Sequence, residues 1–346
     1  MVTSDVHLTI DTARAFVAQV LVALDVPEDE AAIVADTLVE AEARGVPSHG
    51  LFRLTRYVAK YRDGHIVCPT PLTVVKETAS TLLMDGGLGW GQVIGVRTME
   101  RCIAKAREAG SCIASVRNAN HFGAGAYYVE MAARAGMIGM AMAASGEAGD
   151  GICVAPWGGY RPLIDTNPMA FGFPGGAAPG VTLDMATTAV SQGRLRIYEQ
   201  RGEQIPDGWA LDRDGNPSND PTAGLAGTML PLGGYKGYGL GLVVDLLCRL
   251  LPGSVYPHTP NDGHFFAAID ISAFQPLEQF QEAMDRNADT IASAPRRPGF
   301  DEILLPGQRG HRARRQSMER GVTVPARTWQ GIVELATDLK LSPPVV

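Results

Sequence analysis

The sequence predicts an α/β (α+β) protein with a helical N-terminal part and a larger remainder in which strands alternate with helices. Two observations support this fold class. Residues 1–64 carry apolar side chains at the helical spacings of three and four, and from about residue 72 short apolar runs alternate with amphipathic stretches. With 346 residues, of which 45% are hydrophobic and 19% charged, the composition is that of a globular protein with a sizeable core.

Three helices are expected before residue 65. Asp11 is placed to cap the first helix, which runs to about Leu24. Pro27 suits the first turn of the second helix, because three acidic residues follow it at the positive end of the helix dipole. Gly45 suits the left-handed residue that ends this helix. The third helix is expected over residues 50–62.

From residue 72 onward, apolar runs predict strands and amphipathic runs predict helices. Strands are expected at 72–77, 80–85, 111–116, 137–144, 170–173, 181–185 and 264–271. Helices are expected at 92–109, 124–135, 187–201, 237–251 and 276–292, with two more after Gly310 and Pro325. Residues 145–181 and 202–236 are rich in glycine, proline and other turn-forming residues, which predicts loops around shorter elements.

Composition argues against several classes of partner. The net charge is -7 and no dense basic run occurs, so nucleic acid is not expected as a partner. No apolar run reaches the roughly 18–20 residues of a membrane span, and the first residues lack the layout of a signal peptide. The five cysteines form no Cys-x-x-Cys pair, which fits reduced thiols and a cytoplasmic location.

Residues 83–92 resemble the phosphate loop of a Rossmann domain, because a glycine-rich turn follows a strand and opens a helix. The spacing does not match, since the third glycine of the fingerprint would be residue 92, which is Gln92. The next strand ends in Arg117 rather than in an acidic residue, although an arginine there could suit a 2′-phosphate. A plain strand–turn–helix corner is therefore the favoured interpretation.

The sharpest candidate site lies at the start of the third expected helix. His49, Arg53 and Tyr57 are spaced by four residues, so they would share one face of a helix. An arginine can grip a carboxylate with two hydrogen bonds, and a histidine can exchange a proton near neutral pH. The alternative is a solvated polar face that Ser48 caps.

Three further segments carry candidate residues. His121 follows a predicted strand, where ligand contacts are common, although a turn histidine bonded to backbone is the alternative. Asp184 lies at a strand-to-helix junction, where it could cap the following helix or orient a histidine. The glycine-rich segment 232–239 contains Lys236 and precedes a helix, which suits either a phosphate site or close packing of helix on sheet.

No metal site is expected. His258 and His264 lie six residues apart with Asp262 between them, but no second pair of metal-ligand spacing accompanies them. A structural loop explains this arrangement better than a metal ion does.

Together these motifs resemble one family, the type-2 malate/L-lactate dehydrogenases. The family also includes sulfolactate and ureidoglycolate dehydrogenases, diketogulonate reductase and the piperideine/pyrroline-2-carboxylate reductases. The resemblance covers about residues 8–340. The matching motifs occur in the family's order: Ser48-His49-Gly50-x-x-Arg53-x-x-x-Tyr57, Asn120-His121-Phe122-Gly123, Ala155-Pro156-Trp157-Gly158-Gly159, Thr166-Asn167-Pro168, Leu183-Asp184-Met185-Ala186-Thr187, Pro231-Leu232-Gly233-Gly234-Tyr235-Lys236-Gly237-Tyr238-Gly239 and Leu305-Pro306-Gly307.

The resemblance implies how the chain is organised. It implies a helical domain of residues 1–75, joined by the C-terminal helices of 310–346, and an α/β domain of residues 76–309 that binds cofactor and substrate. The nucleotide-binding domain is expected to be non-Rossmann, with a mixed, mostly antiparallel sheet. A homodimer is expected as well.

The resemblance also implies the site. The cofactor is expected to be NAD or NADP, the substrate a small anionic carboxylate, and no metal is expected. The catalytic residues it implies are His49, as the proton donor and acceptor, with Asp184 and His121. The implied substrate-binding residues are Ser48, Arg53, Tyr57, Thr166 and Asn167. The implied cofactor-binding residues are His121, Ser145, Val181, Thr182, Leu183, Asp184, Met185, Ala186, Tyr235, Lys236, Gly307, Gln308 and Arg309.

The expected reaction is hydride transfer between the nicotinamide and C2 of a 2-oxo or 2-hydroxy acid of the malate, lactate or sulfolactate type. Arg53 would hold the carboxylate, His49 would protonate the oxygen, and Asp184 would stabilise protonated His49. Reduction of a cyclic imino acid is the alternative within enzymes, and a non-catalytic nicotinamide sensor is the alternative outside them. Two features depart from the family's pattern: Gln308, where a glutamate is usual, and a longer, more acidic loop over 145–153.

Overall fold

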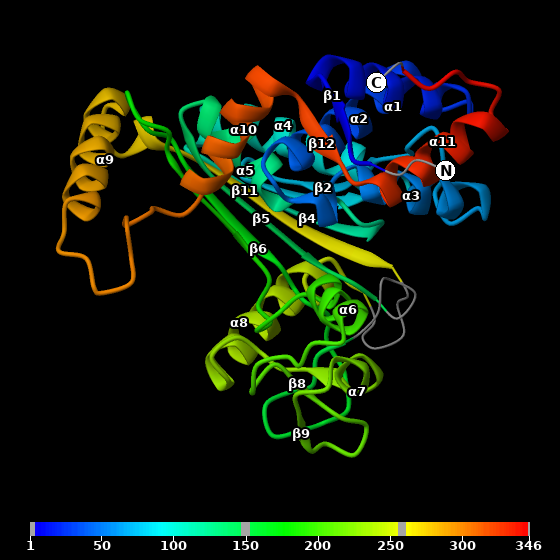
Figure 1. Cartoon of the computed structure of the whole chain (residues 1–346). Coiled ribbons are helices and arrows are strands. Elements are labelled where there is room, and N and C mark those ends of the chain that lie inside the picture. The colour runs from blue at the N-terminus through cyan, green and yellow to red at the C-terminus, as the bar shows by residue number, and fades with distance from the viewer. Residues whose placement is uncertain (1–3, 147–152, 255–260, 345–346) are drawn as a thin grey trace.

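The structure is a computed structural model that describes residues 4–146, 153–254 and 261–344. It consists of one large sheet with helices on both faces, an N-terminal group of helices at one side and a small lobe below (Figure 1). The N-terminal group contains β1 (Val6–Leu8), α1 (Ile10–Val22), α2 (Glu28–Ala43), the 3-10 turns η1 (Pro47–His49) and η2 (Leu51–Arg53), and α3 (Leu54–Arg62).

Two of the three predicted N-terminal helices lie where the sequence placed them. The cap of α1, however, is Thr9 rather than Asp11, because the Thr9 hydroxyl accepts a hydrogen bond from the Thr12 amide at 3.1 Å. Asp11 lies within the first turn, at the positive end of the helix dipole. Helix α2 begins at Glu28, so Pro27 is its N-cap rather than part of its first turn, and Arg44 lies at its end.

The third helix begins at Leu54 and not at residue 50, and two 3-10 turns precede it. The reason is a contact with α2: a carboxylate oxygen of Glu42 accepts the Leu51 amide at 2.9 Å. A Cβ on Gly50 would lie 2.2 Å from that carboxylate oxygen, so a larger residue there would displace the Glu42 side chain. His49 and Arg53 therefore sit on two short turns rather than on one continuous helix face.

The two ends of the chain meet in a short ribbon that the sequence did not predict. Strand β1 pairs antiparallel with β12 (Val322–Val324), with Val6 opposite Val324. Helix α11 (Ala326–Asp338) contributes Trp329 and Ile332 to the same apolar core as α1, α2 and α3. On this shared core we propose the division into a helical domain of residues 1–75 with 310–346 and an α/β domain of residues 76–309.

The large sheet is mixed and mostly antiparallel, as expected. Its strand order is β2-β3-β4-β11-β5-β6-β7, and among these described strands only β3 and β4 run parallel. The strands are β2 (Thr73–Glu77), β3 (Thr81–Asp85), β4 (Ser111–Ala119), β5 (Met137–Ala144), β6 (Met169–Phe173), β7 (Val181–Met185) and β11 (Asp262–Asp270).

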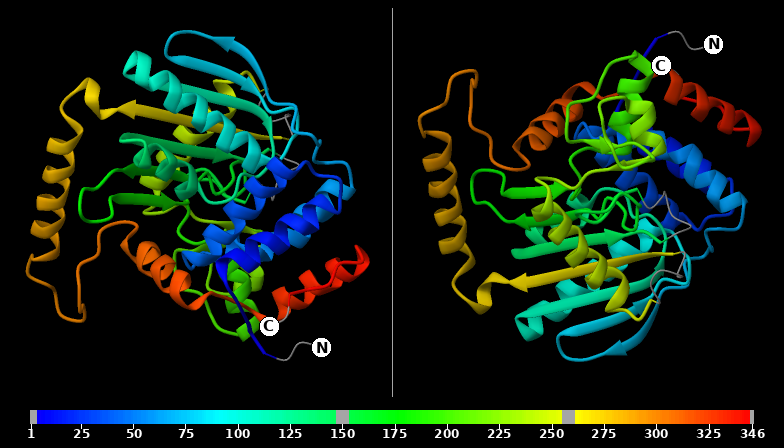
Figure 2. Two further views of the ribbon diagram at one scale, coloured as in Figure 1. Left: turned by 90° about the horizontal axis from the view of Figure 1, so that it is seen from above. Right: turned by 90° about the horizontal axis from the view of Figure 1, so that it is seen from below.

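Helices cover both faces of this sheet. Helices α4 (Gly91–Ala109) and α5 (Gly125–Arg134) pack on one face over a core that includes Met84, Val116 and Phe266. Helix α8 (Tyr235–Asp245) continues into the π-helix η3 (Leu246–Leu250), and this pair covers the opposite face through Val244 and Cys248. Figure 2 shows α9 (Leu277–Ala292) along one end of the sheet, away from the N-terminal helices.

The turn-rich region forms the small lobe (Figure 1). It contains α6 (Gln192–Arg201), β8 (Ala210–Leu211), β9 (Pro217–Ser218), α7 (Pro221–Ala226) and β10 (Thr228–Met229). Helix α6 begins five residues later than predicted, because the Thr187 and Thr188 hydroxyls bond to backbone carbonyls and Ser191 caps the helix instead. Helix α10 (Gln308–Arg320), beyond α9, leads to the C-terminal strand and helix, and η4 (Ile271–Ala273) precedes α9.

The glycine-rich turn at 83–92 is the plain strand–turn–helix corner that the sequence favoured. The Asp85 carboxylate accepts the Gly87 amide at 3.0 Å and the Arg117 guanidinium at 2.9 Å, which closes the corner against the end of β4. Arg117 therefore completes an internal ion pair.

Candidate active site

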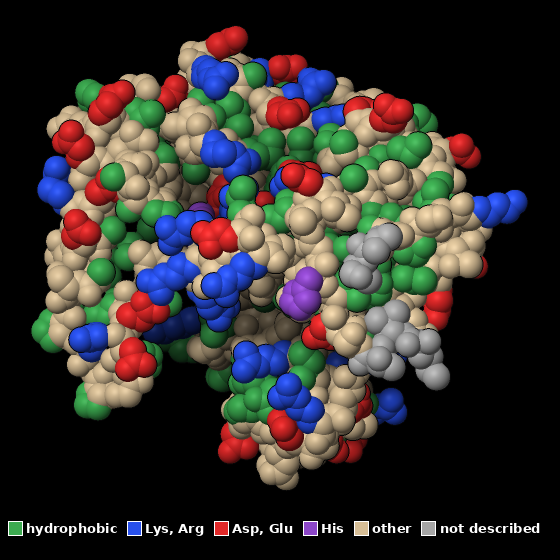
Figure 3. All heavy atoms as spheres, turned by 45° about the horizontal axis from the view of Figure 1, so that its top comes forward, with side chains coloured by type: hydrophobic (Ala, Val, Ile, Leu, Met, Phe, Trp, Pro, Cys, Tyr) green, Lys and Arg blue, Asp and Glu red, His purple; other side chains and the backbone are tan. Residues whose placement is uncertain are grey.

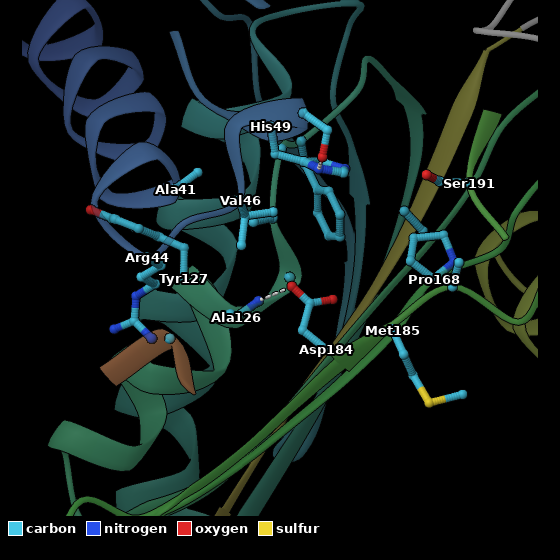
Figure 4. A pocket seen from close by; sticks show the side chains of 18 of the residues that line it. Ala41, Arg44, Val46, His49, Ala126, Tyr127, Pro168, Asp184, Met185 and Ser191 are labelled. Atoms are coloured by element: carbon cyan, nitrogen blue, oxygen red, sulfur yellow. Dashed lines mark hydrogen bonds between the residues drawn. The ribbon is translucent and has the colours of Figure 1, made fainter. Parts of the chain in front are cut away.

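A cavity of about 670 Å³ lies between the N-terminal helices, the β5–β7 side of the sheet and the first turn of α10. This volume falls within the roughly 300–1,000 Å³ range of small-molecule sites. Figure 4 shows His49 and Asp184 entering it from different elements, with the side chain of Ala41 on α2 at its edge. Figure 3 shows Lys and Arg side chains gathered beside the recess between the main body and the small lobe.

Most of the predicted site residues line this cavity. Those in its wall are Ser48, His49, Arg53, His121, Ser145, Thr166, Thr182, Asp184, Met185, Ala186, Gly307 and Arg309. Among the described residues, the predicted positions outside the wall are Tyr57, Asn167, Val181, Leu183, Tyr235, Lys236 and Gln308. The loop 145–153 was noted above as longer and more acidic than the family's pattern. Its residues 147–152 lie outside the described residues, as does His258.

Several positions outside the wall have other contacts. The Asn167 side chain is fully buried and donates to the Gly241 carbonyl at 2.8 Å. The Gln308 side chain turns back and accepts the Leu305 amide at 3.0 Å, so it braces the turn before α10. Tyr235 and Lys236 are exposed in the first turn of α8. A Cβ at Gly237 would lie 2.1 Å from the Leu232 carbonyl oxygen, so close packing explains this glycine.

His121 is the centre of the polar end of the cavity. Its Nδ1 lies 2.7 Å from the Tyr57 hydroxyl, and its ring stacks on His49 with the centroids 5.6 Å apart. Tyr57 therefore reaches the site through His121 rather than by facing the cavity. Burial lowers the pKa of His121 well below its usual value, and the positive charge of Arg53 lowers it further.

His49 and Arg53 are held by the turn that contains Ser48. The Ser48 hydroxyl lies 3.0 Å from His49 Nδ1, and Arg53 Nε donates to the Ser48 carbonyl at 2.8 Å. The structure thus brings His49, Arg53 and Tyr57 together near His121. They lie on two 3-10 turns and α3 rather than on the single helix that the sequence suggested.

Asp184 caps a helix, but not the one that follows it in sequence. Its Oδ2 accepts the Ala126 amide at 2.8 Å, which places it at the first turn of α5 (Figure 4). Asp184 is exposed to the cavity, and the protein around its carboxylate raises the pKa of Asp184, although the Ala126 and Gly125 amides oppose this. A role in orienting His49 remains a proposal.

An ion-pair junction that the sequence did not predict forms part of the cavity wall, since Glu40 and Arg44 line the cavity. Arg44 on α2 pairs with Glu130 on α5 through both guanidinium nitrogens, and its Nε lies 2.7 Å from Glu40. Arg314 on α10 also binds Glu40 at 2.7 Å, and Thr182 on β7 donates to Glu130 at 3.0 Å. The junction fastens three helices and a strand together, and its only sequence signal is the Glu40 and Arg44 pair within an apolar helix.

The residues of the cavity fit a dinucleotide cofactor. Arg309 and Gly310 line it at the N-terminus of α10, where free backbone amides and a guanidinium suit phosphate groups. Thr182 and Met185 on β7, with Ala186 directly after it, also line the cavity. No group of three metal-ligating side chains occurs in the described ranges, and no helix there is long and apolar enough to cross a membrane.

Comparisons with known proteins identify the family of the chain. Residues 8–333 match the model of the malate/L-lactate dehydrogenase family. The chain is 39% identical to a malate dehydrogenase of Pyrococcus horikoshii, over 94% of this chain and 93% of that one. It is 33% identical to a Δ1-pyrroline-2-carboxylate reductase of Ancylobacter novellus, over 93% and 95%. The solved sulfolactate dehydrogenase of Methanocaldococcus jannaschii superposes with a TM-score of 0.89 at 33% identity, covering 97% of this chain and 98% of that one.

These matches define the class of protein as a dinucleotide-dependent dehydrogenase whose sheet is not of the Rossmann type. The chain belongs to the malate/L-lactate dehydrogenase family, which confirms the resemblance carried by its motifs. It is an NAD(P)-dependent oxidoreductase of the 2-hydroxyacid dehydrogenase kind, and a carboxylate substrate fits its cavity.

Proposed function

We propose that the protein reduces small 2-oxo acids of the malate, lactate or sulfolactate type, and oxidises the matching 2-hydroxy acids, with His49 as the acid/base. The observation that carries this proposal is the convergence of His49, His121 and Arg53 at one end of a cavity whose other end is the N-terminus of α10. A guanidinium beside two imidazoles suits a substrate with a carboxylate next to a carbonyl.

Four side chains have different roles in the proposed reaction. The reduced nicotinamide, when bound, supplies a hydride to C2. His49 gives a proton to the C2 oxygen, and Arg53 holds the carboxylate so that C2 stays aimed at the cofactor. Ser48 orients the His49 ring through its 3.0 Å contact to Nδ1, and Asp184 stabilises the protonated imidazole through the field of its carboxylate across the cavity.

The remaining site residues form two groups: those that line the cavity and those that hold the lining residues in place. Thr166 on the substrate side, and Ser145, Thr182, Met185, Ala186, Gly307 and Arg309 on the cofactor side, would contact the ligands because they line the cavity. Asn167, Val181, Leu183 and Gln308 would act by holding the backbone of that wall in place. For Tyr235 and Lys236 we propose a cofactor contact from the exposed first turn of α8, and Lys236→Ala should then weaken cofactor binding.

The substrate is tested with a panel. The purified protein is mixed with NADH or NADPH and with oxaloacetate, pyruvate, sulfopyruvate, 2,3-diketogulonate or piperideine-2-carboxylate, and the loss of nicotinamide absorbance is followed. Turnover of a 2-oxo acid is the expected result. Turnover of the cyclic imino acid alone would establish the alternative reductase, and cofactor binding without any turnover would favour a sensor.

We also propose that the protein is a homodimer that buries the outer face of α8 and η3. This face exposes Leu240, Val243, Leu246, Leu250 and Leu251, with 40–58% of each residue accessible. A contiguous apolar patch of this kind is unusual on a monomer. A second copy of the chain is the proposed occupant because it presents the same apolar face, as a two-fold interface requires.

Light scattering tests the dimer. The wild-type protein should show twice the 36.8 kDa mass of one chain, and Val243→Asp with Leu250→Asp should reduce it to that of one chain. The matched control is Ile197→Asp on α6, since Ile197 is 47% exposed and lies outside this face. A wild-type mass of one chain would contradict the proposed interface.

We propose a cytoplasmic location as well. All five cysteines are free thiols, and Cys102, Cys112, Cys153 and Cys248 are buried, which suits a reducing compartment. Fractionation of cells with an antibody to the protein checks this, and its recovery in an oxidising compartment would contradict it.

A further inference from the structure

The Nδ1 atom of His121 lies between two hydrogen-bond donors. The Gly123 backbone amide is 3.2 Å away and the Tyr57 hydroxyl is 2.7 Å away. A backbone N–H can only donate, so Nδ1 must present its lone pair. The ring proton of His121 therefore sits on Nε2, and the Tyr57 hydroxyl donates to the same Nδ1.

We propose that Tyr57 and the Gly123 amide lock His121 as the neutral Nε2–H tautomer, so that His121 is a fixed hydrogen-bond donor to a substrate oxygen while His49 alone exchanges the proton. This inference rests on the proposed function and divides the work of the two stacked histidines. Tyr57 is then a positioning residue, since it acts on the substrate only through His121.

The surroundings of His121 favour the neutral ring. Four charged or titratable side chains near His121 lower its pKa, so each disfavours protonation of the ring. They are Arg53, His49, Lys60 and His264. Tyr57 is only 3% exposed, so its hydroxyl donates to Nδ1 from the protein interior. A protonated His121 would place an N–H against the Gly123 amide, which is a contact between two donors.

Three hydrogen bonds hold the backbone of the turn that carries His121. The Asn120 side chain donates to the Leu88 carbonyl at 2.8 Å. His264 Nε2 lies 3.0 Å from the Asn120 carbonyl, and the Tyr128 hydroxyl donates to the Phe122 carbonyl. Since Nδ1 is occupied and His121 lines the cavity, Nε2 is the nitrogen through which it would contact a substrate.

The proton balance of the reduction follows. C2 gains a hydride and is reduced, the nicotinamide is oxidised, and the C2 oxygen takes its proton from His49. His121 keeps its Nε2 proton throughout and stabilises the negative charge that builds on the substrate oxygen.

The first test is independent of turnover. ¹⁵N NMR of the full-length protein with labelled histidine reports the tautomer of each ring, and His121 is assigned by the signal missing from His121→Gln. The expected result is a neutral Nε2–H pattern for His121 throughout the range from about pH 5 to about pH 8. A Nδ1–H or doubly protonated ring in that range would overturn the proposal, whatever the substrate panel gives.

The second test uses substrate. Tyr57→Phe should lower kcat/KM roughly tenfold, the value of one hydrogen bond, and should let His121 take up a proton at higher pH in the ¹⁵N spectrum. His121→Gln keeps an N–H donor and should retain roughly ten times the kcat/KM of His121→Leu. The matched control is Tyr61→Phe on the same helix, whose hydroxyl donates to the Leu24 carbonyl at 3.0 Å. Equal losses in His121→Gln and His121→Leu would contradict the donor role.

Discussion

His49→Asn is expected to lower kcat by about 10²- to 10⁴-fold, the usual worth of a positioned acid/base. Asparagine cannot deliver a proton near neutral pH, so the oxygen at C2 would take its proton from water. The fold should survive, because His49 lies on a surface turn and is only partly buried. Steady-state kinetics with the substrate identified by the panel measures this loss.

The control for this substitution is His65→Asn, since His65 is an exposed histidine on the turn after α3. It should keep wild-type kcat. Cofactor binding by His49→Asn, followed by nicotinamide fluorescence, should also stay close to wild type. Near-wild-type turnover in His49→Asn with intact folding would contradict the acid/base role.

Arg44→Leu is expected to lower the free energy of unfolding by about 3–5 kcal/mol, the cost of breaking a buried ion pair from one side. The side chains of Arg44 and Glu130 are only 9% and 11% exposed, so the substitution would leave the Glu130 carboxylate poorly compensated. The double variant Arg44→Leu with Glu130→Leu should lose less than the sum of the two single losses. Urea unfolding at one protein concentration measures all three variants.

A surface ion pair provides the comparison. Arg286 and Glu282 on α9 are 3.6 Å apart and about 70% exposed, and Arg286→Leu should cost only about 0–1 kcal/mol. An equally small loss in Arg44→Leu would show that the junction in the cavity wall does not hold the helices together.

Local signals in the sequence predicted most of the fold. The proline and acidic residues at the start of α2, the apolar runs of the large sheet and the amphipathic runs between them each depend on residues close together in the chain. The misses depend on distant residues. Strands β1 and β12 have three residues each and lie more than 300 residues apart in the sequence, so no periodicity marks them.

The candidate site shows the same division. The motifs around His49, His121 and Thr166 were recognised, and all three line one cavity. Their geometry could not be predicted, because it follows from contacts such as Glu42 to Leu51 and Asp184 to Ala126, the second of which spans 58 residues. The Arg44 junction was missed for this reason as well, since Arg44 and Glu130 are 86 residues apart.

Transfer of deuterium from the cofactor is the measurement that tests the central claim most directly. The enzyme is given its 2-oxo acid with NADH or NADPH that carries deuterium at C4 of the nicotinamide, on one face and then on the other. The account predicts that one of the two labelled cofactors places a deuterium on C2 of the product, as mass spectrometry and proton NMR would report. A product free of deuterium at C2 with both cofactors, although cofactor is consumed, would contradict direct hydride transfer to that carbon.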